Sequence, residues 1–214
     1  MHRRRALHLI GALAGVPALP VLGRFSDAEL LALGTRIHEQ LEGEPYEPRA
    51  LTPGQHRQVD VAAEQIIPRT QTPGATDVRV ADFIDTMLAD WYTAPERARF
   101  IAGLVDLDAR AVTTHGRPFV DISGVARVAL LTAIDDEVMA LRRTNIQAGN
   151  EHWFATLKFL TVWGYFTSRA GVEQELGTQA FPGRYDGDAA VRARTDPDVN
   201  RETGRGIGDT SVHA

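Results

Sequence analysis

The stretch that decides the fold class runs from residue 80 to residue 111 and reads VADFIDTMLADWYTAPERARFIAGLVDLDARA. Its large apolar residues recur every three or four positions on both sides of a central break, which is the period of an α-helix with one buried face. The break is Thr93-Ala94-Pro95-Glu96, a capping box with an early helical proline. The stretch therefore predicts two consecutive helices. Their predicted buried positions are Val80, Phe83, Ile84, Met87, Leu88 and Trp91, then Phe100, Ile101, Leu104, Leu107 and Ala111.

The chain before this stretch carries the same helix signals. Ser26-Asp27-Ala28-Glu29 and Thr52-Pro53-Gly54-Gln55 both have the pattern of a capping box, in which two side chains satisfy free amides at the start of a helix. The first predicted helix ends before Gly43 and the second before Pro68, since both residues interrupt a helix. We expect Asp77 to cap the helix that begins near residue 80.

Two further helices are predicted after residue 111. Gly116 is expected to end the preceding helix, and Ser123 to cap a long helix that follows. Asn150 is expected to cap a last apolar helix that ends near Gly171. The sequence contains no sustained alternation of apolar and polar residues and no Asn-Gly hairpin signal, so it predicts an all-α, bundle-like domain of about six helices.

Composition divides the chain into three parts. Residues 1–23 have the character of an export signal, residues 24–177 carry the helical pattern, and residues 178–214 form a charged, glycine-containing tail. Such a tail cannot bury enough apolar surface to fold alone, so we expect it to be extended and partly disordered. Its two aromatic residues, Phe181 and Tyr185, favour docking of residues 178–188 on another surface.

The N-terminus resembles a twin-arginine signal, which directs folded proteins across the bacterial inner membrane. Arg4 and Arg5 precede an apolar run that extends to Val16. An ordinary secretory signal or an uncleaved anchor is the alternative. The apolar run is shorter than the roughly 20 residues that a spanning helix needs, so we expect a periplasmic protein with no membrane span in the mature chain.

Composition also excludes several kinds of partner and cofactor. The 214 residues contain no cysteine, which excludes thiolate zinc, iron–sulfur clusters and covalent c-type haem. The chain has 28 acidic and 23 basic residues, three of the latter in the signal, and an acidic protein is a poor ligand for nucleic acid. No cofactor motif is present in a suitable context. The reason for folded export is therefore expected to be a partner protein.

A metal site is the main chemical alternative, and the ligand spacing argues against it. Asp135-Asp136-Glu137 and Glu151-His152 place carboxylates and an imidazole in neighbouring segments. Ferritin-like sites need a Glu-x-x-His pair on one helix, and this chain has none. We interpret these residues as solvated charges at a loop between helices. The sequence thus predicts no catalytic, cofactor-binding or metal-binding residue.

Aromatic residues near the end of the helical pattern suggest a partner surface. Residues 162–166 read VWGYF and leave no polar face, so the helix must be covered on both sides. Aromatic side chains tend to dominate protein interfaces. The predicted interface residues are Trp163, Tyr165, Phe166, Phe181, Pro182, Arg184 and Tyr185.

Several short motifs between residues 51 and 188 give the chain a family resemblance. The motifs are Leu51-Thr52-Pro53 through Ile66-Ile67-Pro68, Val80-Ala81-Asp82-Phe83-Ile84-Asp85, Gly116-x-x-Phe119, Tyr165-Phe166-Thr167-Ser168-x-x-Gly171, Leu176-Gly177 and Pro182-Gly183. In these motifs the chain resembles the gluconate 2-dehydrogenase subunit 3 family.

The resemblance implies a function. Members are small twin-arginine-exported subunits that accompany an FAD-containing sugar or polyol dehydrogenase of the glucose-methanol-choline (GMC) oxidoreductase class. The catalytic subunit carries the flavin and typically crosses the membrane with the small subunit, and in some such systems electrons leave through a cytochrome c. We therefore expect a non-catalytic, hitch-hiker small subunit. A free-standing periplasmic binding or scaffold protein is the alternative, and a metal-dependent helical enzyme is a third.

Overall fold

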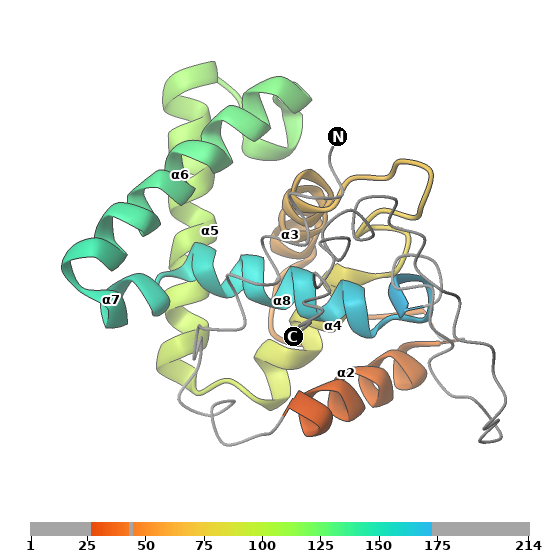
Figure 1. Ribbon diagram of the computed structural model, residues 1–214. Helices are drawn as coiled ribbons and strands as arrows, with labels where there is room; N and C mark the ends of the chain where they lie inside the picture. The colour runs from red at the N-terminus through yellow and green to blue at the C-terminus, as the bar shows by residue number, and fades with distance from the viewer. Residues whose placement is uncertain (1–26, 43–44, 173–214) are drawn as a thin grey trace, which may run out of the picture. The chain divides into compact units, whose positions relative to one another are not determined.

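The computed structural model describes residues 27–42 and 45–172, which form seven α-helices and one 3₁₀ helix without a β-strand (Figure 1). The elements are α2 (Asp27–Leu41), α3 (Pro53–Ile66), α4 (Val80–Asp90), α5 (Ala94–His115), η2 (Phe119–Asp121), α6 (Gly124–Thr144), α7 (Ile146–Asn150) and α8 (Trp153–Thr167). The predicted all-α class is confirmed. Within these residues, no helix combines the length and the apolar character needed to span a membrane.

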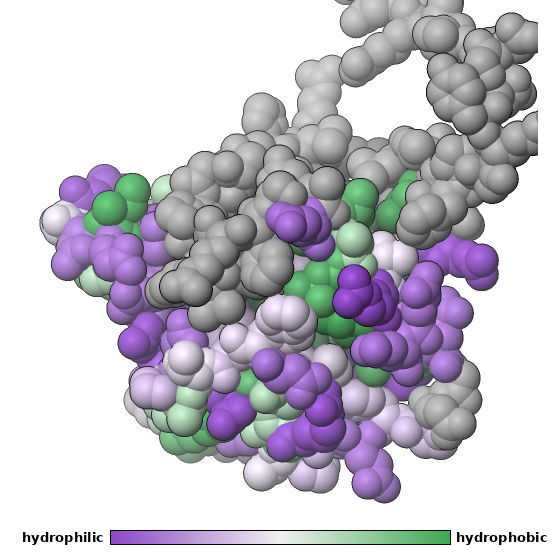
Figure 2. Space-filling view, turned by 90° about the horizontal axis from the view of Figure 1, so that it is seen from below, coloured by the Kyte–Doolittle hydropathy of each residue, from purple (hydrophilic) through white to green (hydrophobic). Residues whose placement is uncertain are grey.

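Helices α4 and α8 form the centre of the fold. All nine residues from Val80 to Leu88 are buried, because α2, α3 and α8 pack around α4. Close contact between α4 and α8 depends on Gly164, where an added Cβ would lie 2.7 Å from Cδ1 of Phe83. The Phe83 ring also meets Trp163 edge-on, with 5.2 Å between the ring centroids. On the face shown in Figure 2, apolar residues are visible near the middle, with hydrophilic residues to the sides and below.

Helix α5 crosses α8 near its beginning, and a second glycine permits the contact. An added Cβ at Gly103 would lie only 2.0 Å from Cγ of Trp153. Helix α6 follows η2 and crosses α5 in the view of Figure 1, then leads into the short helix α7. Only three residues of α6 are fully buried, namely Leu131, Ile134 and Val138.

Most predicted helix boundaries are confirmed where the cap is local in sequence. Thr52 and Thr93 both form complete capping boxes, and the Ser123 side chain accepts a hydrogen bond from the Ala126 amide. Gly116 ends α5 in the left-handed conformation, with φ of 72°. Ser26 lies outside the described residues.

Two predicted caps are wrong. Asp77 does not cap α4, because its carboxylate accepts the Gly74 amide at 2.8 Å and pairs with Arg69. The N-cap is Arg79, which has a left-handed φ of 57° and no capping side-chain hydrogen bond. Asn150 instead ends α7, and α8 begins after His152, whose Nδ1 accepts the Phe154 amide at 3.2 Å.

Candidate functional site

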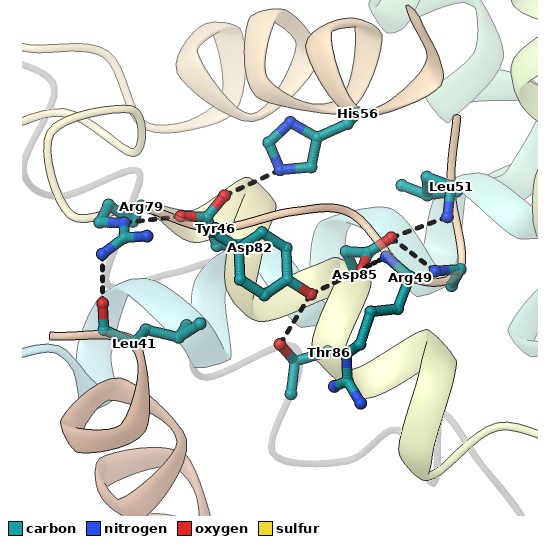
Figure 3. Close-up of polar contacts among 10 residues, drawn as sticks. Leu41, Tyr46, Arg49, Leu51, His56, Arg79, Asp82, Asp85 and Thr86 are labelled. Carbon is teal, nitrogen blue, oxygen red and sulfur yellow. Dashed lines mark hydrogen bonds and ion pairs between the residues drawn. The ribbon is translucent and has the colours of Figure 1, made fainter. Parts of the chain in front are cut away.

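A buried carboxylate on α4 lies at the centre of a polar cluster (Figure 3). Asp85 is 0% exposed. Its Oδ1 accepts hydrogen bonds from the amides of Ala50 at 3.1 Å and Leu51 at 2.8 Å. Its Oδ2 accepts the Arg49 amide at 2.7 Å and the Tyr46 hydroxyl at 2.6 Å. Three successive backbone amides therefore converge on one carboxylate and fix the segment that leads into α3.

Tyr46 is held in its neutral, donating form at this cluster. Burial, together with the hydrogen bond to Asp85, raises the pKa of Tyr46 to about 12. Its hydroxyl also lies 3.0 Å from Oγ1 of Thr86. The Tyr46 side chain thus joins the segment before α3 to two neighbouring residues of α4.

Asp82, one helical turn earlier on α4, connects this helix to α3 directly and to α2 through Arg79. Its Oδ1 lies 2.8 Å from Nε2 of His56 on α3, and its Oδ2 accepts a hydrogen bond from Nε of Arg79 at 2.6 Å. Burial alone would raise the pKa of Asp82, but the hydrogen bonds from His56 and Arg79 lower it below its usual value. Arg79 also donates to the carbonyl of Leu41 at the end of α2. Asp82 and Asp85 together position α2, α3 and the segment between them.

The Asp135-Asp136-Glu137 run has a different location from the one predicted. These residues lie in the middle of α6 rather than at a loop between helices, so the predicted location is wrong for them. Asp136 and Glu137 are nevertheless exposed, and Glu151 and His152 do lie between α7 and α8 as predicted. Asp135 pairs with Lys158 at 2.7 Å, and Glu137 pairs with Arg110 at 2.6 Å. No group of three or more His, Asp or Glu side chains suited to a metal ion occurs within residues 27–42 and 45–172. The absence of a metal or cofactor from the whole chain stays a prediction.

A cavity of about 280 Å³ lies beside α2, the turn before α4 and the residues that follow α8. His38 at its wall is engaged with α8: its Nε2 lies 2.6 Å from the Gly164 carbonyl, and its ring stacks on Phe83. Burial lowers the pKa of His38.

The three described aromatic residues of the predicted interface pack on the chain itself. Tyr165 is 1% exposed and donates its hydroxyl to the Pro73 carbonyl at 2.8 Å. Trp163 is half-buried and donates from Nε1 to the Leu30 carbonyl on α2 at 3.1 Å. Phe166 is half-buried and meets Tyr165 edge-on. Their contact with a partner stays a prediction.

The other predicted site residues lie outside the described residues. They are Arg4 and Arg5 of the signal and Phe181, Pro182, Arg184 and Tyr185 of the tail. Conversely, sequence reasoning did not single out Asp82 and Asp85 as the centre of a polar cluster. The available signal was the presence of two carboxylates, three positions apart, in an otherwise apolar stretch.

Comparison with models of protein families identifies the family of the chain. A model of the family described as gluconate 2-dehydrogenase subunit 3 matches residues 53–183, which is more than half of the chain. The chain belongs to the gluconate 2-dehydrogenase subunit 3 family. Searches of curated proteins and of solved structures found no match.

In this member of the gluconate 2-dehydrogenase subunit 3 family, the motifs that carried the resemblance organise the fold. Thr52 begins α3, and the motif at the start of α4 supplies Asp82 and Asp85. In the closing motif, Oγ of Ser168 donates to the Tyr165 carbonyl at 2.6 Å and accepts the Gly171 amide at 3.1 Å. These described motif residues therefore hold helices and turns in place.

The His56–Asp82 pair predicts a pH dependence of stability. The hydrogen bond to Asp82 raises the pKa of His56 in the folded state. Stability from this pair is fully present below the unfolded histidine pKa of about 6.5 and is lost as the pH rises through the folded value. His38 and His152 have lowered pKa values, so their protonation affects stability below about pH 6.5 instead.

We therefore expect His56→Gln to flatten the decline in stability as the pH rises above about 6.5. Urea denaturation of both proteins across this range measures the effect, because the difference between the two curves removes contributions shared by both. Parallel curves for the wild type and the variant would contradict the assignment.

Proposed function

We propose that this chain is the non-catalytic small subunit of a periplasmic FAD-dependent sugar dehydrogenase, and that it binds the catalytic flavoprotein and is exported with it through the twin-arginine route. Membership of the gluconate 2-dehydrogenase subunit 3 family is the observation that carries the proposal, because it makes the chain a small subunit of a dehydrogenase complex. The GMC-type partner would supply FAD and catalysis, with a cytochrome c as a further electron acceptor.

The chemistry of the described residues supports a non-catalytic role. The carboxylates of Asp82 and Asp85 accept hydrogen bonds that position helices, and Asp135 and Glu137 are paired with basic residues. His38 and His56 are likewise engaged in contacts between helices. Each of these groups thus has a structural partner within the chain that accounts for its position.

Co-export is supported by the sequence of the signal together with the kind of fold behind it. Arg4 and Arg5 match the pair of a twin-arginine signal. The cluster around Asp85 joins residues 34 to 39 positions apart, so it forms only in a folded chain. A route that carries folded proteins would deliver this subunit already able to hold its partner.

The test is to replace Arg4 and Arg5 with Lys while the catalytic flavoprotein is produced in the same cells. We expect both proteins to stay in the cytoplasm, because a twin-arginine route requires the arginine pair. Immunoblots locate both subunits in the periplasmic and cytoplasmic fractions, and flavin absorbance locates the bound cofactor in the same fractions. The matched control is Arg3→Lys in the same basic run, which should leave export intact.

Two outcomes would count against the proposal. If the flavoprotein reached the periplasm while the doubly substituted small subunit did not, co-export would be wrong. If the two proteins never associated in either compartment, the chain would be better described as a free-standing periplasmic binding or scaffold protein.

A further inference from the structure

Large exposed apolar side chains in the described part of the chain are concentrated on α5, α6 and α7. Six of the seven fall on these helices, and the seventh, Leu31, lies on α2. The six are Val105 and Val112 on α5, Val125, Val128 and Met139 on α6, and Ile146 on α7. Single exposed apolar residues are ordinary, whereas several on one face of one helix indicate a surface that is covered in the functional assembly.

Helix α6 carries such a run in its first half. Val125, Val128, Thr132 and Met139 follow one another at spacings of three, four and seven residues, which places them on one helix face. The face is separate from the stripe of Leu131, Ile134 and Val138 that packs into the core. We call these four residues the outer face of α6.

The first half of α6 lacks the charges that a solvated helix face normally carries. Six residues between 124 and 133 are exposed, and none of them is charged. Arg127 is half-buried and donates to the carbonyls of Phe119 and Val120. Val125 is 83% exposed, although burying a valine side chain is favourable by about 1.5 kcal/mol or more.

We infer that the catalytic subunit of the dehydrogenase docks on the outer face of α6. The inference rests on the proposed function, since family membership supplies a partner subunit that must bind somewhere on this chain. The aromatic residues predicted from sequence offer less, because Tyr165 is buried and Trp163 is bonded to α2. The exposed Asp136 lies between Thr132 and Met139, and the exposed Arg143 follows Met139, so charged residues border the apolar first half of α6 as the polar rim borders the apolar centre of most interfaces.

The size of this face indicates what else the interface needs. A 21-residue helix is about 31 Å long and roughly 10 Å wide, so one face offers on the order of 300 Å² in projection. A standard interface buries about 800 Å² on each partner. The catalytic subunit therefore contacts α6 together with another segment of this chain.

The test compares two matched double substitutions in the full chain, co-produced with the GMC-type flavoprotein. Val125→Glu with Val128→Glu places two charges on α6, and Val105→Glu with Val112→Glu places two on α5 at similarly exposed valines. We expect the α6 variant to retain about tenfold less flavin per captured small subunit, and the α5 variant to match the wild type. Circular dichroism and thermal melting check the fold of each variant.

Crosslinking provides a second measurement that does not depend on the glutamate variants folding. A photocrosslinking residue at position 128 should capture the flavoprotein, and one at position 105 should not. Flavoprotein capture from 105 but not 128, or crosslinking of 128 to a second copy of this chain, would overturn the inference. So would full flavin retention by a folded α6 variant. If the unsubstituted chain retained no flavoprotein, the proposed function itself would fail.

Discussion

Replacing Asp85 with alanine is expected to destabilise the folded chain by about 4–5 kcal/mol, because three backbone amides and the Tyr46 hydroxyl would lose their acceptor. Each buried donor left without a partner costs about 1–3 kcal/mol, and relaxation and water entry reduce the sum. Domains are stable by only about 5–15 kcal/mol, so the loss is a large fraction of the total. Urea denaturation measures it directly.

Two related variants make this prediction specific. Asp85→Asn keeps one acceptor oxygen and should lose less stability than Asp85→Ala. Asp90→Ala is the matched control, since Asp90 lies on the same helix and pairs with Arg49 at 2.8 Å, but its side chain is 46% exposed. Exposed pairs contribute about 1 kcal/mol or less. Equal losses for Asp85→Ala and Asp90→Ala would refute the role given to the buried carboxylate.

The second large effect is expected at Gly103, where α5 meets α8. Alanine there would place its Cβ 2.0 Å from Cγ of Trp153 and 2.3 Å from Cδ2. These are atoms of a rigid and buried ring, so relief requires the two helices to separate. We expect Gly103→Ala to cost about 3 kcal/mol, at the upper end for overpacking, despite the better helix propensity of alanine.

Gly54→Ala is the control for this substitution, because Gly54 is also helical but nothing lies within 4 Å of an added Cβ. It should be neutral or stabilise the chain by up to about 1 kcal/mol. Gly103→Ala is therefore expected to lower the thermal midpoint, and Gly54→Ala to leave it unchanged or raise it. A destabilisation of the same size at both positions would mean that contact with Trp153 is not the cause.

The features that sequence predicted well are those specified by residues a few positions apart. A capping box needs only four consecutive residues, and both Thr52 and Thr93 were identified from that pattern. The apolar periodicity likewise identified the long helices. The five-residue helix α7 was missed, because it is too short to show a period, and its presence moved the start of α8 from Asn150 to His152.

Features that depend on distant residues were not predictable in the same way. The partners of Asp85 lie 34 to 39 positions earlier in the chain, so no local pattern connects them. For α8, sequence correctly required cover on both sides, but it could not tell whether α2 or another protein supplies that cover. Trp163 shows the outcome, since its indole donates to a carbonyl of this chain's own α2.

The hydrogen bonds of Asp85 constrain the residue type at the acceptor position but not at most of the donor positions. The acceptor is a particular side chain, but three of its four donors are backbone amides, which every residue except proline possesses. Arg49, Ala50 and Leu51 could therefore diverge among relatives without losing these bonds, while the acid on α4 could not. A distant relative is better recognised by the acid at this position of an apolar helix than by a matching partner motif.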